Sequence, residues 1–272
     1  MEPERQRQME PELVSEIAVI GGSGYIGSYL CKYLPACPDP LDTSKFKVVI
    51  YLAGVSKRYA CNDSWENTYS KNVTQVVNFA KKLEPERQLF IYASTGAICC
   101  GQTSLDNYTK SMLLREREIS KLPIRSIGLR IAGVVGRTPN MRMDLIYHAM
   151  LQTALRGKTI QVQNPNTSRG VLWINDLLEA IRCIVNCKVP RESRHEIFEL
   201  CSFNTTVLDI ARDISQATCI PFKSFETGNP VPGFKLESTE FSRVFGFTFK
   251  GTRENVIEDL LGVGEGTLTP LA

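Results

Sequence analysis

Apolar residues along this chain gather in short runs that do not alternate with polar positions. Four such runs are residues 16–21, 47–53, 89–93 and 126–131. Strands of this kind are buried on both faces, as in a parallel sheet with helices on each side. The helical stretches between them are residues 25–34, 70–83 and 107–121. Strands that alternate with helices in this way predict a doubly wound α/β fold.

After about residue 140 strands and helices no longer alternate regularly. Further helices are expected at residues 144–155, 174–187 and 207–217, and short strands at residues 159–162 and 196–200. We expect these segments to form a small lobe over the carboxyl edge of the sheet, where sheets of this kind bind ligands. The charged residues 1–14 are expected to be disordered.

The turn between the first strand and the first helix is rich in glycine. Residues 21–27, GGSGYIG, fit both GxGxxG and GxxGxxG. Glycines there make a tight turn, let the backbone approach a pyrophosphate, and leave N–H groups at the start of a helix to receive its charge. This glycine turn predicts a bound dinucleotide or another nucleotide; the alternative is a turn kept only for packing.

A dinucleotide site usually adds an acidic residue about 20 positions further on, at the end of the next strand. Here a loop broken by three prolines leads straight from the first helix to the strand at 47–53. No strand is therefore expected to present an acid. Asp39 and Asp42 lie in that loop, and we interpret them as turn residues beside prolines.

Composition excludes several classes of protein. The 272 residues carry 32 lysines and arginines against 29 acids, a net charge of +3, and the basic residues form no stripe that would bind nucleic acid. The longest apolar stretch, residues 46–55, is shorter than the roughly 20 residues that cross a membrane. Nine cysteines without CxxC, and only two histidines, predict free thiols and no metal site. A cytoplasmic location is expected, because the charged N-terminus is unlike a targeting peptide.

Seven segments of the chain follow one another in a recognisable order: GGSGYIG, VVIYLAG, KNVTQVV, IYASTGAICCG, YTKSMLLRERE, LRIAGVVGRTPN and SRGVLWINDLLEAI. Together they resemble the extended short-chain dehydrogenase/reductase family, the NAD-dependent nucleotide-sugar epimerases and dehydratases. The resemblance implies a Rossmann-like doubly wound sheet, and the short loop before the strand at 47–53 predicts that this chain lacks the usual second and third strands. It also implies a nucleotide-binding domain at residues 15–140 and, at residues 141–272, a substrate lobe with elements that return to the main sheet.

The resemblance also implies which residues bind. NAD or NADP would contact the following residues: Gly21, Gly24, Tyr25, Ile26, Gly27, Ala53, Gly54 and Asn72. Arg169 would meet the diphosphate of a small substrate such as a nucleotide sugar, because its planar fork makes two parallel hydrogen bonds. The alternative for Arg169 is a surface arginine in a loop. A homodimer through the helix after Tyr108 and its neighbour at 70–83 is a further expectation.

The catalytic signature departs from the family. In YTKSMLLRERE, Tyr108 matches the acid/base tyrosine, and Met112 stands where the lysine belongs. A tyrosine has an ordinary pKa of about 10 and needs a nearby cation to form phenolate at neutral pH. Lys110 is a poor substitute, because it lies roughly 200° around the helix from Tyr108. Glu116 and Glu118 are expected on a solvated face of this helix.

The family's signature also has a serine or threonine upstream of the tyrosine, and in this chain that position does not carry a hydroxyl. Counting back from Gly101, the family's serine or threonine position falls on Gly96. Thr95 could replace it if the strand end shifts by one residue, and Ser94 lies just before. Both hydroxyls could instead satisfy backbone groups where the strand ends.

These observations favour a divergent NAD(P)-dependent oxidoreductase, epimerase or dehydratase, with Tyr108 as acid or base and Thr95 or Ser94 as hydrogen-bond donor. Two alternatives stay open. The first is a non-catalytic nucleotide-binding or scaffold protein of the same fold. The second is a redox-neutral isomerase or cyclase that reuses the pocket.

Overall fold

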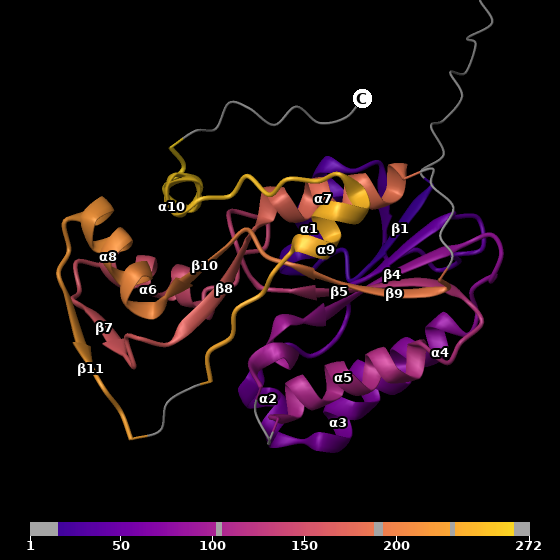
Figure 1. Ribbon diagram of the computed structural model, residues 1–272, viewed down its shortest axis with the longest axis horizontal. Helices are drawn as coiled ribbons and strands as arrows, with labels where there is room; N and C mark the ends of the chain where they lie inside the picture. The colour runs from indigo at the N-terminus through magenta and orange to yellow at the C-terminus, as the bar shows by residue number, and fades with distance from the viewer. Residues whose placement is uncertain (1–15, 102–104, 188–192, 229–231, 264–272) are drawn as a thin grey trace, which may run out of the picture.

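A six-stranded parallel sheet forms the centre of the computed structural model, which describes residues 16–101, 105–187, 193–228 and 232–263 (Figure 1). The strands, in spatial order, are β2 (Ala36–Pro38), β1 (Ile17–Ile20), β3 (Val48–Tyr51), β4 (Leu89–Thr95), β5 (Arg125–Ile131) and β9 (His195–Leu200). Every neighbouring pair is parallel. The doubly wound α/β fold is confirmed.

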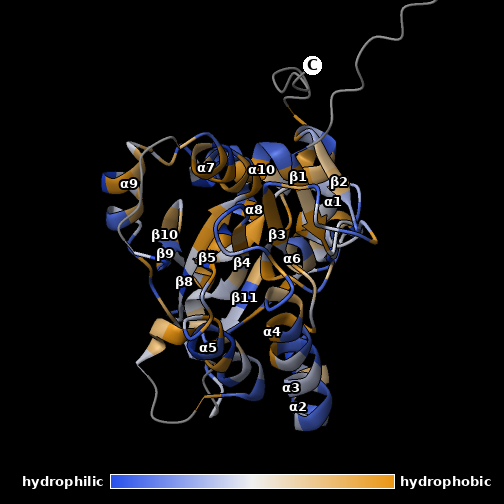
Figure 2. Cartoon of the chain, turned by 90° about the vertical axis from the view of Figure 1, so that its right-hand side faces the viewer, coloured by the Kyte–Doolittle hydropathy of each residue, from blue (hydrophilic) through white to orange (hydrophobic). Residues whose placement is uncertain are grey.

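Helices cover both faces of this sheet. One face packs on α1 (Tyr25–Tyr33), α7 (Ile174–Asn186) and α9 (Thr239–Phe245), and the other on α4 (Gln75–Ala80) and α5 (Asn107–Ile119). Successive strand residues point to opposite faces, so that Val19 and Ile50 contact the first layer while Val49 and Phe90 contact the second. Both sets are buried, which explains why the strands are apolar throughout. Figure 2 shows β3, β4 and β5 between α7 on one side and α4 and α5 on the other, helices whose ribbons carry both hydrophobic and hydrophilic residues.

Two short helices and a π-helical turn precede α4 on its side of the sheet. They are α2 (Arg58–Asp63), α3 (Trp65–Tyr69) and η1 (Ser70–Thr74). A 3-10 turn, η2 (Gly96–Cys100), follows β4 directly. The sequence predicted one helix over 70–83, and the structure divides this stretch between η1 and α4.

A smaller lobe lies beside the sheet. Its strands are β6 (Gly133–Val135), β8 (Ser168–Trp173) and β10 (Phe203–Thr206) in one sheet, and β7 (Ile160–Gln163) and β11 (Phe222–Phe225) in another. Its helices are α6 (Ile146–Leu155), α8 (Val207–Thr218) and α10 (Arg253–Leu261), which share an apolar core with these strands. Between β8 and β10 the chain returns to the main sheet as α7 and β9.

The prediction that the second strand is missing is wrong. β2 is only three residues long, yet it pairs in parallel with β1, with Ala36 opposite Ile17 and Pro38 opposite Val19. A strand this short, with a proline inside it, leaves no apolar run in the sequence. Pro38 lacks a backbone N–H, and it is tolerated because β2 is the edge of the sheet, where no further strand needs this hydrogen-bond donor. Within the described ranges no strand lies outside β2, and the expected disorder of residues 1–14 concerns residues outside them.

Candidate active site

A cavity of about 700 Å³ opens at the carboxyl ends of β1, β3, β4 and β5. We call it the main cavity. It is lined by the glycine turn, the loop after β3, the end of β4 and one face of α5. Every cofactor-binding and catalytic residue that the sequence predicted lines it: Gly21, Gly24, Tyr25, Ile26, Gly27, Ala53, Gly54, Asn72, Ser94, Thr95 and Tyr108. The fold thus brings together residues that lie up to 87 positions apart.

The glycine turn is built so that backbone comes very close to backbone. A Cβ atom on Gly27 would lie 2.0 Å from the carbonyl oxygen of Gly21, and Gly21 itself has a φ of +89°. Only glycine fits these two positions. Gly24 caps α1 without any side-chain hydrogen bond, so the N–H groups of the first turn have no side-chain acceptor. A diphosphate fits such a helix start.

Asp39 directly follows β2 and reaches back to the glycine turn. Its Oδ1 accepts a hydrogen bond from the Gly21 N–H at 2.6 Å, and its own N–H donates to the carbonyl oxygen of Val19 at 2.9 Å. The expectation that no strand presents an acid is therefore wrong. Asp39 is exposed directly after the end of β2 and does not itself line the main cavity. Asp42, in contrast, binds the N–H and hydroxyl of Ser44 as a turn residue does.

Asn72 fixes the loop that follows β3. Its buried amide accepts from the Val55 N–H at 2.8 Å and donates to the Val55 carbonyl at 2.9 Å and to the Ser111 hydroxyl at 3.1 Å. Gly54, in the same loop, has a φ of +150°, and a Cβ there would lie 2.6 Å from Asn72 Oδ1. The side chain comes from the π-helical turn η1, a distortion that is common at functional sites.

Tyr108 and Thr95 meet in the main cavity. Tyr108 lies on the first turn of α5, and the hydroxyl of Thr95, the last residue of β4, is near enough to lower the pKa of its phenol. Burial raises the pKa of Tyr108, while Arg115, the Thr95 hydroxyl and Arg142 oppose that rise and Cys61 adds to it. The structure thus pairs the predicted acid/base residue with a hydroxyl one position earlier than the family's serine.

The other two hydroxyl positions are not available for this task. Ser94 also lines the main cavity, but its hydroxyl donates to Glu116 Oε1 at 2.5 Å. A Cβ on Gly96 would lie 2.4 Å from Leu236 Cδ1 and 3.0 Å from Phe234 Cε2. Leu236 thus occupies the space that a serine at position 96 would need.

A cation faces the main cavity, although it is not a lysine. Met112 is buried in the wall, and the ammonium of Lys110 lies 4.6 Å from the centre of the Trp65 ring, on another side of α5. One turn beyond Met112, Arg115 lines the cavity with only 2% of its surface exposed. Its Nε donates to the Asn72 carbonyl at 2.6 Å and its Nη1 to the Ala93 carbonyl at 2.8 Å.

Sequence reasoning missed Arg115 because it considered this residue only as one of the dispersed basic residues that form no stripe. The available signal was its spacing: Tyr108, Met112 and Arg115 follow one another by four and three positions and therefore share a helix face. Glu116 was also misplaced. It is 3% exposed and binds Arg130 at 2.8 Å, so the expectation of a solvated face is wrong for this residue.

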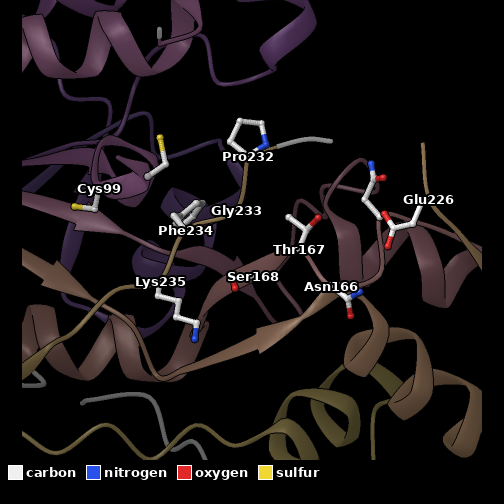
Figure 3. Close-up of a pocket in the computed structure, with 11 residues that line it drawn as sticks. Cys99, Asn166, Thr167, Ser168, Glu226, Pro232, Gly233, Phe234 and Lys235 are labelled. Atoms are coloured by element: carbon white, nitrogen blue, oxygen red, sulfur yellow. The ribbon is translucent and has the colours of Figure 1, made fainter. Parts of the chain in front are cut away.

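A second cavity, of about 650 Å³, adjoins the main one at Phe234, which lines both (Figure 3). It lies between η2, the loop before β8 and the segment at residues 232–235. Arg169 lines neither cavity. Its Nη1 donates to the carbonyls of Ser168 at 3.0 Å and Pro232 at 3.2 Å, both of which belong to residues of the second cavity's wall. Burial, and next the charge of Arg58, lower the pKa of Arg169.

The described residues contain no group of three or more histidine, cysteine or acidic side chains that could hold a metal ion. No helix among them is long and apolar enough to span a bilayer.

No family model matches the sequence, and no curated protein does either. Solved structures do match. UDP-glucuronic acid 4-epimerase from Bacillus cereus, in complex with UDP-glucuronic acid and NAD, superposes with a TM-score of 0.75 at 16% identity, over 91% of this chain and 98% of that one. RMD from Pseudomonas aeruginosa, complexed with NADPH, gives a TM-score of 0.76 at 17% identity, over 91% and 98%. UDP-glucose 4-epimerase from Thermotoga maritima, with UDP-glucose, gives 0.75 at 16%, over 93% and 99%.

Proposed function

We propose that this chain, which has the fold of the extended short-chain dehydrogenases/reductases, is a divergent NAD(P)-dependent oxidoreductase, epimerase or dehydratase of a nucleotide-linked sugar. The observation that carries the proposal is the pairing of Tyr108 with Thr95 in the cavity that also holds the glycine turn. The matching structures support it, since they were solved with NAD, NADPH or a UDP-sugar.

The residues present fit a dinucleotide. The glycine turn would hold its diphosphate, Asp39 its adenosine ribose, and the loop at Gly54, fixed by Asn72, would pass beneath it. When bound there, the nicotinamide would accept or donate a hydride.

The chain's own residues would handle the proton. As a substrate alcohol is oxidised, its hydroxyl proton passes to the Tyr108 oxygen, and it returns when the carbonyl is reduced. Thr95 would donate a hydrogen bond to the same substrate oxygen and hold it beside Tyr108. Met112 and Ile131 give the cavity apolar walls, which limit the water around the reacting oxygen.

The anionic part of the substrate would lie towards the second cavity. Arg169 stands behind its wall, and Arg58 lies near enough to depress the pKa of Arg169. Two close cations favour a diphosphate, and Arg169 would have to exchange its two carbonyl acceptors for phosphate oxygens. A homodimer through α4 and α5 and a cytoplasmic location belong to the same proposal; the nine free cysteines support a reducing compartment.

Dinucleotide binding and the role of Tyr108 can be tested together. NADH and NADPH are titrated against the purified chain by nicotinamide fluorescence, and we expect a dissociation constant in the micromolar range for at least one. UDP-glucose or UDP-glucuronic acid is then added to the protein with oxidised cofactor, and the absorbance of reduced nicotinamide is followed. Tyr108→Phe should bind cofactor normally and slow reduction at least about 100-fold, because it removes the proton acceptor.

Tyr69→Phe is the matched control, because Tyr69 is an exposed phenol on α3. It should leave both binding and reduction unchanged. If the folded protein binds neither dinucleotide, or if Tyr108→Phe reduces cofactor as fast as the wild type, the proposed function is wrong.

A further inference from the structure

We propose that Arg115 is a positioning residue whose positive charge favours the phenolate form of Tyr108. It thereby takes the part of the lysine whose position Met112 occupies. This inference rests on the proposed function, because it assigns a partner to the tyrosine of the same site. The geometry of α5, the burial of the guanidinium and the charges around Tyr108 each support it.

The first support is the placement of the guanidinium. An arginine side chain is long, and from position 115 it extends back along the face of α5 that carries Tyr108 and Met112. Its head is held by the Asn72 carbonyl on η1 and by the Ala93 carbonyl on β4. These two anchors belong to different elements that both line the main cavity, so the charge is fixed beside the site and is not free to move into solvent.

The second support is an unused donor. Arg115 Nη2 is buried and has no hydrogen-bond partner among the described residues. A buried donor without a partner costs free energy, so its presence calls for a reason. A Cβ on Gly54 would lie only 3.1 Å from this nitrogen, which places Nη2 against the loop that lines the cavity. The donor is thus at the cavity wall, where a ligand atom could approach it.

The third support is the lack of a counter-charge. Arg115 makes no ion pair within the described ranges, and the neighbouring carboxylate of Glu116 is engaged by Arg130 and Ser94. Burial lowers the pKa of Arg115, and the groups that oppose this shift are three phenols, those of Tyr108, Tyr51 and Tyr92. The charge of the guanidinium is therefore not neutralised by an acid.

The other groups that face Tyr108 cannot replace Arg115. Arg142 comes from the segment before α6, and its guanidinium is paired with Asp144. Cys61 comes from α2 and opposes ionisation of the phenol, while Thr95 contributes a hydrogen bond and no charge. Of the two cations that favour the phenolate, Arg115 has the larger effect.

The test titrates Tyr108 in the protein without cofactor. The ultraviolet absorbance of phenolate is recorded as the pH is raised, and the curve of the Tyr108→Phe variant is subtracted in each background. Arg115→Gln removes the charge and keeps an amide donor for the Ala93 carbonyl. We expect it to move the midpoint of the Tyr108 curve upward by about 1 pH unit or more, which corresponds to a roughly tenfold smaller phenolate fraction at neutral pH.

A second substitution that restores a cation distinguishes the loss of charge from a change in structure. In the double variant Arg115→Gln/Met112→Lys a cation stands one turn closer to Tyr108, and the midpoint should return towards that of the wild type. With a substrate that reduces the bound cofactor, Arg115→Gln should lower kcat about tenfold with little change in KM, and the double variant should recover it. If Arg115→Gln does not fold, Arg115→Lys, which keeps a charge, is compared with Arg115→Met in the same titration, and only the second should move the midpoint.

Lys110→Gln is the control, because Lys110 lies over Trp65 on another side of α5. An unchanged midpoint in folded Arg115→Gln, or an equal shift in Lys110→Gln, would overturn the inference. Failure of the proposed function is recognised separately. If the protein binds no dinucleotide but the midpoint moves as expected, the electrostatic pairing stands and the dehydrogenase function fails.

Discussion

Asp39 is a turn residue by its sequence, and in the structure its carboxylate contacts the glycine turn. It lies between two prolines, only 12 positions after Gly27, where spacing rules do not look for a ribose acid. In the structure the short strand β2 carries it to the glycine turn, where its Oδ1 meets the Gly21 N–H. A carboxylate there accepts hydrogen bonds from ribose hydroxyls and repels a phosphate on the 2′ oxygen.

We therefore expect this chain to bind NADH more tightly than NADPH. Asp39→Asn removes the charge at constant shape and should reduce that preference about tenfold or more, because the repulsion of the 2′-phosphate disappears. Fluorescence titrations with both dinucleotides measure the ratio. Asp42→Asn, in the same loop, is the control and should leave the ratio unchanged. A wild-type protein that prefers NADPH would contradict this assignment of Asp39.

The glycine turn could be predicted from its own residues, because a tight turn at a helix start needs glycine. Gly54, Asn72 and Tyr108 were predicted from the resemblance to the extended short-chain dehydrogenase/reductase family, and all of these residues line the main cavity. Arg115 and Leu236 could not be placed in this way. Their roles depend on how far a side chain extends and on which segment packs opposite it, and neither is encoded within a short window of sequence.

At the scale of elements, α5 joins the site to the sheet. Asp106 caps its first turn by accepting from the Thr109 N–H at 2.7 Å, so the helix begins at Asn107 and turns Lys110 away from Tyr108. Two turns later Glu116 faces the sheet and binds both the Arg130 guanidinium and the Ser94 hydroxyl. This buried ion pair fixes α5 against the carboxyl ends of β4 and β5, where Thr95 must meet Tyr108.

The two neighbouring glutamates of α5 should differ strongly in their effect on stability. Glu116→Ala leaves Arg130 without its buried partner and should lower the free energy of unfolding by about 3 kcal/mol. Glu118 pairs with the exposed ammonium of Lys121, so Glu118→Ala should cost less than about 1 kcal/mol. Urea unfolding of both variants gives the comparison. Equal losses would mean that the Glu116 ion pair does not fix the helix.

The helices and parallel strands were predicted better than the smaller lobe. Short apolar runs and the glycine turn predicted β1, α1, β3, β4, α5 and β5, because each of these elements is buried. Strands β2 and β10 contain proline or polar residues and form no apolar run, and β6 has only three residues. They exist because a neighbouring strand supplies the hydrogen bonds, and this pairing is set by the tertiary fold.

At the scale of the whole molecule, the two parts of the chain meet around a buried histidine. His148 on α6 is 2% exposed, and its ring meets the Tyr25 ring of α1 edge-on, with centres 5.6 Å apart. The Tyr25 hydroxyl donates to the Gly136 carbonyl at 2.9 Å, which ties the glycine turn to the start of the smaller lobe. His195, the second histidine of the chain, begins β9 and binds the Ser126 hydroxyl at 2.8 Å.

Stability should therefore fall as the pH drops below about 6.5, the ordinary pKa of histidine. Burial lowers the pKa of both His148 and His195, so the unfolded chain binds more protons than the folded one in this range. Each histidine contributes a slope of up to about 1.4 kcal/mol per pH unit until its folded pKa is reached. Urea unfolding at several pH values between about 7.5 and 5 measures the slope. His195→Gln should reduce it, and a flat profile would show that neither histidine is buried as a neutral group.

The packing at Gly96 couples two positions that are 140 residues apart. Because Leu236 and Phe234 fill the space beside this glycine, a serine at position 96 would meet both side chains. Gly96→Ser should therefore be tolerated only together with a smaller residue at position 236, so the effects of the two substitutions on stability are not additive.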